Sequence, residues 1–235
     1  SLRSEVIATA ANIVTIQETH SLRKGLIKMP VGFVTFEAIR KAKHGGTMCT
    51  IHQDLNPKLI EEHNDPFELL VVEVEADSEN IRIITGCGPQ ENWDETKRMP
   101  FYIALEAEIV KAELAGKSVI IQMDSNSKLG NEYIPKDPHP MSPNGKILAA
   151  IIERHALIVA NGSEHCSGLI TRQRSTRNRI EQSCIDLLIF SSDLKKHFKY
   201  LEIDEQRRHV LTRVKQTKKG PITKESDHNV LIAEF

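Results

Sequence analysis

Hydrophobic residues occur in short runs along the chain, and most of these runs are rich in β-branched side chains. Runs of this length and composition predict buried β-strands. Longer stretches with helical spacing predict amphipathic helices. We expect strands over residues 11–16, 47–51, 69–74, 81–84, 118–121, 157–159, 185–190 and 229–235, and helices over 2–11, 95–115 and 145–154.

Strands and helices do not alternate regularly in this pattern. Glu79 and Asn80 stand between two strand runs, where they predict a hairpin turn. Hairpins interspersed with helices indicate an α/β fold with a mixed sheet rather than a uniform series of parallel strands. No repeat or linker divides the 235 residues, so we expect a single domain over residues 1–235 with long loops at 127–144 and 205–225.

Composition narrows the possible partners. The net charge is -1, so nucleic acid would have to bind local basic patches rather than an overall positive field. Two such patches run from Lys215 to Lys224 and from Thr171 to Arg179, and either one is equally readable as a solvated loop. Four cysteines without paired spacing favour a reducing compartment. With no apolar stretch of membrane-span length, we expect an intracellular protein, nuclear or cytoplasmic, that does not cross a membrane.

The end of one apolar run carries the most informative polar pair. The run from Val119 to Met123 ends in Asp124, and Asn126 follows two residues later. Side chains two apart on a strand point to the same side, and open α/β sheets bind ligands at the carboxyl ends of their strands. A carboxylate beside a carboxamide suits a site for a metal and a phosphate. An ordinary turn at a strand end explains the pair equally well.

Other strand ends carry residues of the same chemical kind. Glu18 follows the first strand run. Gln90 follows a Gly/Pro turn that comes after the strand run over 81–84. Asp186 stands inside an apolar strand and therefore needs a partner, for which Arg179 is one choice. Each feature alone has a structural explanation, as a surface carboxylate, a tight turn or a salt bridge.

Asp227 and His228 stand immediately before the last strand run. A histidine beside a carboxylate is the usual arrangement for a general base or for a group that polarises a phosphate. Isolated pairs of this kind are common by chance. The grouping of all these residues at strand ends is what favours a shared site.

Taken in order, these residues resemble a known superfamily. Gln17-Glu18-Thr19, Asp124 with Asn126, Ile185-Asp186 and Ser226-Asp227-His228 are similar to the motifs of the endonuclease/exonuclease/phosphatase superfamily, which has the DNase I-like fold. The neighbouring stretches 86–90 and 123–130 look most like the endonuclease domains attached to reverse transcriptases of non-LTR retroelements. The resemblance implies a four-layered α/β sandwich of two mixed β-sheets flanked by helices.

The resemblance also implies a role for each residue. Asp124 would orient or deprotonate the attacking water, and Asn126 would position the scissile phosphate. His228 would stabilise the charge that develops on this phosphate, while Asp186 would hold the imidazole in orientation. Together these groups imply phosphodiester hydrolysis.

A metal and substrate contacts complete the implied site. Glu18 would hold a divalent ion, Mg²⁺ or Mn²⁺, with Asp227 beside it as a ligand or an acceptor. Gln90, Thr171 and Ser226 would contact the substrate. The implied partners are DNA and a reverse transcriptase domain on the same polypeptide, and we expect the protein to be a monomer.

Two departures from the superfamily pattern bear on activity. The first strand and its Asn, which precede the Gln-Glu-Thr segment in relatives, are not in residues 1–10, so we expect an N-terminal truncation. Cys87 stands where many relatives carry a phosphate-contacting Tyr, and a thiol is the weaker donor. Two alternatives to a nicking DNA endonuclease therefore stay open. One is a phosphatase or phospholipase of the same fold, and the other is a catalytically impaired nucleic-acid-binding domain.

Overall fold

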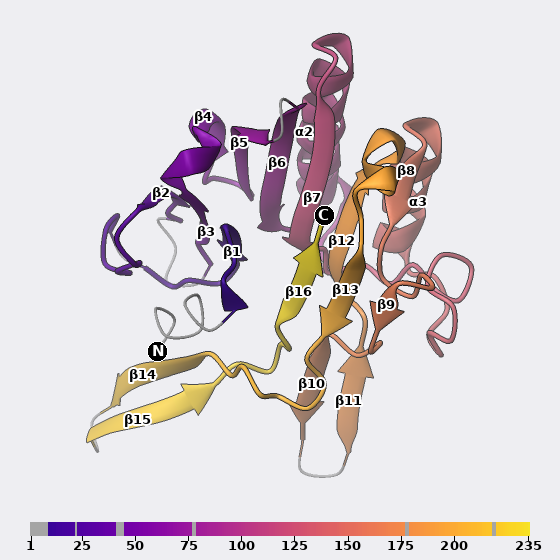
Figure 1. Cartoon of the computed structure of the whole chain (residues 1–235). Coiled ribbons are helices and arrows are strands. Elements are labelled where there is room, and N and C mark those ends of the chain that lie inside the picture. The colour runs from indigo at the N-terminus through magenta and orange to yellow at the C-terminus, as the bar shows by residue number, and fades with distance from the viewer. Residues whose placement is uncertain (1–8, 22, 41–44, 77–78, 177–178, 218–219) are drawn as a thin grey trace.

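A six-stranded mixed sheet forms the centre of the molecule (Figure 1). The computed structural model describes residues 9–21, 23–40, 45–76, 79–176, 179–217 and 220–235. The strand order in this sheet is β4-β5-β6-β7-β12-β8, in which β6 and β7 run parallel and the other neighbours antiparallel. The strands are β4 (Lys58–His63), β5 (Glu68–Ala76), β6 (Glu79–Cys87), β7 (Ser118–Asp124), β8 (Leu157–Val159) and β12 (Asp186–Ser191).

Two helices, α2 (Glu95–Leu114) and α3 (Pro143–Arg154), cover one face of this sheet. Each begins at a side-chain cap, since Asp94 accepts a hydrogen bond from the Lys97 amide and Ser142 accepts one from the Gly145 amide. The helices predicted over residues 95–115 and 145–154 are confirmed. Their apolar side chains form one core with alternate residues of the central strands.

The other face of the central sheet packs on two smaller sheets. Leu70 and Val72 of β5 face this side, in a core with Ile51 and Leu201. One small sheet has the order β1-β3-β2 and the other β16-β13-β9. Their strands are β1 (Ile13–Ile16), β2 (Phe33–Ala38), β3 (Thr47–His52), β9 (Cys166–Ser167), β13 (Tyr200–Ile203) and β16 (Leu231–Glu234). The central sheet is therefore buried on both faces, which is why its strands appear in the sequence as continuous apolar runs.

Two hairpins extend from the layered body (Figure 1). One pairs β10 (Arg172–Ser175) with β11 (Ile180–Ser183), and the other pairs β14 (Thr212–Thr217) with β15 (Gly220–Glu225). The second lies within the segment that we predicted as a loop over 205–225, and that prediction was wrong there. Short 3₁₀ helices, η1 (Gln53–Leu55) and η2 (Ser192–Lys196), complete the described elements.

The mixed α/β class is confirmed, with differences in detail. Every predicted strand has a counterpart, but Glu79 and Asn80 lie in β6, paired with Ala76 and Glu75, and not in the turn. The helix predicted over residues 2–11 falls mainly on residues 1–8, which lie outside the described residues. The described residues form three layers, and the outer fourth layer of the expected sandwich is not among them. No helix in the described ranges has the length and apolar character needed to cross a membrane.

Candidate active site

Three neighbouring strands bring polar side chains together at one edge of the central sheet. Asp124, the last residue of β7, lies opposite Asp186, the first residue of β12. Cys87, the last residue of β6, is the partner of Asp124 on its other side. Because cross-strand partners point to the same face, the two carboxylates and the thiol are neighbours. Strand register therefore assembles the centre of the site.

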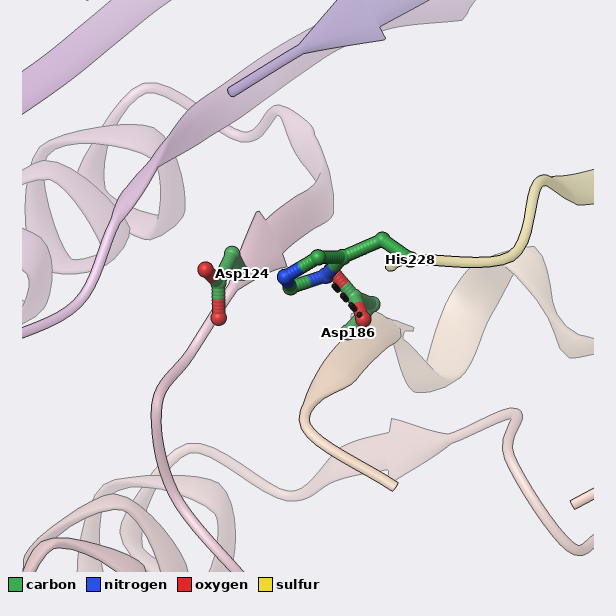
Figure 2. Close-up of side chains that lie close together, drawn as sticks. All are labelled: Asp124, Asp186 and His228. Carbon is green, nitrogen blue, oxygen red and sulfur yellow. Dashed lines mark hydrogen bonds and ion pairs between the residues drawn. The ribbon is translucent and has the colours of Figure 1, made fainter. Parts of the chain in front are cut away.

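His228 completes this group from a distant part of the chain. Its Nδ1 lies 2.9 Å from both carboxylate oxygens of Asp186, and Figure 2 shows the imidazole between Asp186 and Asp124. The backbone amide of His228 donates to the Ser226 hydroxyl, at 3.1 Å. His228 also forms a β-bridge with Arg172 at the start of β10. These contacts fix the position of the ring from both the side chain and the backbone.

Burial and neighbouring charges set the protonation of the group. Burial of Asp124, which is 4% exposed, together with the negative charge of Asp186, raises the pKa of the Asp124 carboxyl to about 7. Burial alone would lower the pKa of His228, but its hydrogen bond to Asp186 and the nearby carboxylates raise this pKa to about 9. At neutral pH, His228 is therefore a cation, while Asp124 is close to its titration point and can accept a proton.

Asn126 reaches Asp124 through a turn rather than along a strand. β7 ends at Asp124, and Asn126 adopts a left-handed conformation with φ of 46°, which asparagine tolerates. The Asn126 backbone amide donates to Asp124 Oδ1 at 3.1 Å, and its side-chain amide donates to the Gly88 carbonyl at 3.0 Å. The same amide nitrogen lies 3.6 Å from Cys87 Sγ, which in turn lies 3.9 Å from Asp124 Oδ2. The predicted pairing of Asp124 with Asn126 is present, with Cys87 between them.

Glu18 lies at the rim of this group. It follows β1, its side chain is about half exposed, and its carboxylate forms an ion pair with His20 Nε2 at 3.7 Å. Its charge contributes to the raised pKa of Asp124, so it is close enough to act on the same site. Gln17 fixes this end of β1 against the central sheet by donating to the Thr85 hydroxyl at 2.9 Å.

Asp227 points to a different partner. Its Oδ2 accepts a hydrogen bond from Arg172 Nε at 3.2 Å, and another guanidinium nitrogen lies at the same distance. Burial would raise the pKa of Asp227, but the charges of His228 and Arg172 outweigh it and lower the pKa overall. Asp227 is therefore ionised and already paired, beside the imidazole.

The three expected substrate contacts lie in different places. Thr171 is fully buried, and its hydroxyl accepts hydrogen bonds from the backbone amides of Ile185 and Asp186. Ser226 supports the His228 backbone, as described above. Gln90 is exposed, in the turn that its carbonyl closes with the Trp93 amide. Of the three, Gln90 is exposed, Ser226 is half-buried and Thr171 is fully buried.

One residue of the site escaped the sequence reasoning, and one expected contact was wrong. The suggestion that Arg179 pairs with Asp186 was wrong. Arg179 pairs with Glu181, and Asp186 pairs with His228. Glu68, the first residue of β5, lies opposite Cys87 and is 2% exposed. A carboxylate inside an apolar run was the signal that singled out Asp186, and Glu68, between Phe67 and Leu69, shows the same signal.

The donor set of this edge fits a hard divalent cation. Burial, with a contribution from Glu18, raises the pKa of Glu68, and Glu18 acts in the same direction on Asp124. Glu68 Oε1 has no hydrogen-bond partner among the described residues, although Arg40 lies 3.8 Å away. Clustered carboxylates that raise one another's pKa are stabilised by a cation, and oxygen ligands suit Mg²⁺ or Mn²⁺.

A second arrangement of possible ligands includes the histidine. Single atoms of Asp124, Asp186 and His228 lie within 4.8 Å of one another. A metal there would have to displace the Nδ1 proton through which His228 binds Asp186. This proton is held strongly, since the pKa of His228 is raised to about 9. The acidic side of the site, with Glu18, is therefore the better fit.

Comparison with known proteins agrees with this architecture. No protein-family model and no curated protein sequence matches the chain. The endonuclease domain of TRAS1, a telomere-specific non-LTR retrotransposon, is similar with a TM-score of 0.64 and 16% identity, over 99% of this chain and 90% of that one. The 3′-5′ exonuclease NExo from Neisseria meningitidis is similar with a TM-score of 0.69 and 16% identity, over 100% of this chain and 93% of that one.

The apurinic endonuclease LMAP from Leishmania major gives a TM-score of 0.71 and 12% identity, over 98% of this chain and 80% of that one. At these identities the likeness establishes the fold. This fold is the DNase I-like fold of the endonuclease/exonuclease/phosphatase superfamily, as the motifs along the sequence predicted. Known members of this fold include nucleases and a phosphatase.

Proposed function

We propose that this chain is a divalent-metal-dependent phosphodiesterase that nicks DNA, as an endonuclease of the non-LTR retroelement type. The observation that carries this proposal is the ion pair between His228 and Asp186 directly opposite the buried Asp124. A fixed cation and a carboxylate that can accept a proton face one another, as phosphodiester hydrolysis requires.

Asp124 is the group that orients the attacking water and takes its proton. Its pKa of about 7 is close to working pH, where a carboxylate is both ionised to a useful extent and basic enough to accept a proton. The Asn126 and Cys87 contacts hold the carboxylate on one side, which leaves its other side for the attacking water.

His228 supplies positive charge to the phosphate oxygens as negative charge builds on them. Asp186 keeps the ring protonated and fixes its orientation through Nδ1, which leaves Nε2 as the donor to the phosphate. Asn126 adds a neutral donor. Of its two amide contacts, the one with the Cys87 sulfur is the weaker and is the one that a phosphate oxygen can replace.

Glu18 would hold the metal, Mg²⁺ or Mn²⁺, with Asp227 nearby as an acceptor. Bound there, a divalent ion supplies positive charge to the phosphate and to the leaving alkoxide. Arg172 already bonds to Asp227 Oδ2, so we assign Asp227 the part of an acceptor beside the metal rather than that of a direct ligand.

DNA is the proposed substrate. NExo has been solved with a product DNA hairpin, and D. rerio TDP2 with a single-strand DNA product. The basic stretch from Thr171 to Arg179 includes β10, which begins beside the site and carries the exposed Arg174, while residues 177 and 178 lie outside the described residues. In the stretch from Lys215 to Lys224, residues 218 and 219 lie outside the described residues. We also propose that the domain works inside the cell as a monomer, with a reverse transcriptase on the same polypeptide.

A plasmid-nicking assay tests the function. We expect conversion of supercoiled to open-circular plasmid with Mg²⁺, none with EDTA, and a loss of about 10²-fold or more in Asp124→Ala and His228→Ala. Asp54→Ala and His165→Ala, which change exposed residues of the same types, are the matched controls. Phosphate release from inositol phosphates without nicking would support a phosphatase. DNA binding without any hydrolysis would support an impaired binding domain.

A further inference from the structure

Thr171 lies where the two halves of the His228–Asp186 pair meet. Its side chain is completely buried, immediately before β10. Its hydroxyl oxygen accepts hydrogen bonds from the amides of Ile185, at 2.9 Å, and Asp186, at 3.0 Å. The hydroxyl also lies 3.4 Å from the carbonyl of Ser183, to which its proton can be donated. One side chain therefore holds the chain as it enters β12.

The backbone of Thr171 is hydrogen-bonded to the segment that carries His228. Its carbonyl accepts a hydrogen bond from the Asn229 amide at 2.6 Å, directly after His228. The Asn229 side chain donates to the Ile170 carbonyl, also at 2.6 Å. On the other side, the Gln173 amide donates to the Asp227 carbonyl at 2.7 Å. The segment around Thr171 is thus hydrogen-bonded to the residues on both sides of His228.

All of the hydrogen-bonding capacity of this hydroxyl is used. A hydroxyl has two acceptor lone pairs and one proton, and the described contacts account for all three. With no exposed surface, it has nothing left to offer to a substrate in this conformation. Two consecutive backbone amides that point at one oxygen need that acceptor, since buried amides are almost always paired.

We propose that Thr171 is a positioning residue whose hydroxyl sets the separation and orientation of Asp186 and His228. The proposal rests on the proposed function, in which this pair stabilises charge on the phosphate. Removal of the acceptor leaves the amides of Ile185 and Asp186 unpaired, and the start of β12 must move to find other partners. A shift of the Asp186 carboxylate changes where Nδ1 of His228 is held, while the surface that binds DNA is unaltered.

The test compares Thr171→Val, which keeps the shape, with Thr171→Ser, which keeps the hydroxyl. Thr171→Val is expected to lower kcat of nicking by about 10- to 100-fold, with KM changed less than about threefold, because a small misplacement of a catalytic group acts on rate. Thr171→Ser should retain kcat within about threefold. Thr50→Val is the matched control, since Thr50 is equally buried but bonds to Thr35 and the Val34 carbonyl, away from the site.

A second readout does not depend on hydrolysis. The Nδ1 proton of His228 gives a low-field NMR signal while it is held by Asp186, assigned by its loss in His228→Gln and recorded in EDTA. Thr171→Val should shift or broaden this signal, and Thr171→Ser should leave it in place. If the wild-type chain does not nick DNA, the proposed function fails while this signal still reports whether Thr171 positions the pair.

An unchanged signal and kcat in Thr171→Val would overturn the proposal, and so would equal losses in the Ser and Val variants. A comparable loss in Thr50→Val would do the same, since it would point to general destabilisation. If Thr171→Val does not fold, Thr171→Cys replaces it. Sulfur is a weak acceptor, so its kcat and signal should fall below those of Thr171→Ser, and equality with Thr171→Ser would contradict the proposal.

Discussion

Asp124 and Asp186 are direct cross-strand partners at the end of β7 and the beginning of β12. Like charges at opposed positions destabilise a sheet, and burial of Asp124 adds to that cost. His228 offsets part of it as a cation bonded to Asp186. The remaining free-energy cost of ionising Asp124 is the reason that its pKa is raised to about 7, through burial and the charge of Asp186. The site therefore keeps an unfavourable carboxylate where a basic group is useful.

Asp124→Asn is expected to stabilise the fold at pH 8 while abolishing nicking. The ordinary pKa of the carboxyl is 3.8, so between about pH 4 and 7 the native protein retains a proton that the unfolded chain has lost. Stability of the parent therefore falls as pH rises through this window, and the full cost is present above about pH 7. Asparagine never ionises, so the variant should gain about 1–3 kcal/mol at pH 8.

Denaturant unfolding at pH 4, 6 and 8 measures this difference. The advantage of Asp124→Asn should be greatest at pH 8 and should disappear near pH 4, where both side chains are neutral. Asp54→Asn, at an exposed position, should show almost no change at any pH. An advantage of the same size at all three pH values would contradict the assignment of the cost to the charge of Asp124.

His228 and Asp186 are expected to act as one unit. Loss of either partner removes a protonated, oriented imidazole, so His228→Gln and Asp186→Asn should each lower kcat by about 10²- to 10⁴-fold. The double variant should then be little worse than the poorer single variant, because the same function is lost only once. Nicking rates of the parent, both single variants and the double variant give the coupling. Multiplicative losses would show that the two residues act independently.

Glu18 is expected to control metal affinity with little effect on stability. Its side chain is half exposed, so Glu18→Gln should change the free energy of unfolding by less than about 0.5 kcal/mol. Loss of the charged oxygen ligand should weaken Mn²⁺ binding by about tenfold or more in isothermal titration. Glu164→Gln, at a more exposed glutamate, is the control. Unchanged Mn²⁺ affinity in Glu18→Gln would place the metal elsewhere, with Glu68 as the next carboxylate to replace.

The central strands were predictable because both of their faces are buried. β7 and β12 lie between helices on one side and small sheets on the other, which requires unbroken apolar runs. β4 is an edge strand with exposed Leu59 and Ile60 beside two glutamates, so it shows neither a run nor an alternation. The β14–β15 hairpin is rich in Lys, Thr, Gly and Pro, which is typical of a loop. Its strands arise from pairing between segments, which no single segment reveals.

The site residues were predictable in kind but not in their contacts. Asp124 was identified by its position at the end of an apolar run, and Asp186 by its position inside one, where burial of a carboxylate is costly. The pairing of Arg172 with Asp227 joins residues 55 apart in the chain, and the local sequence does not specify it. Thr171 was expected at the substrate on the resemblance alone. Its burial depends on how the start of β10 packs against the segment before β16.

Cys87 is expected to affect the acid side of the pH dependence of nicking. Burial and the surrounding carboxylates raise the pKa of its thiol well above the usual value, so it stays protonated, 3.9 Å from Asp124 Oδ2. A hydroxyl is a stronger donor to a carboxylate than a thiol, and donation to the ionised form lowers its pKa. Cys87→Ser should therefore move the acid limb of the kcat profile down by roughly 0.5–1 pH unit, whereas Cys87→Ala should not. Profiles from pH 5 to 8 compare the two, with Cys166→Ser as a control outside the site. Superimposable limbs for Cys87→Ser and Cys87→Ala would show that this side chain does not donate to Asp124.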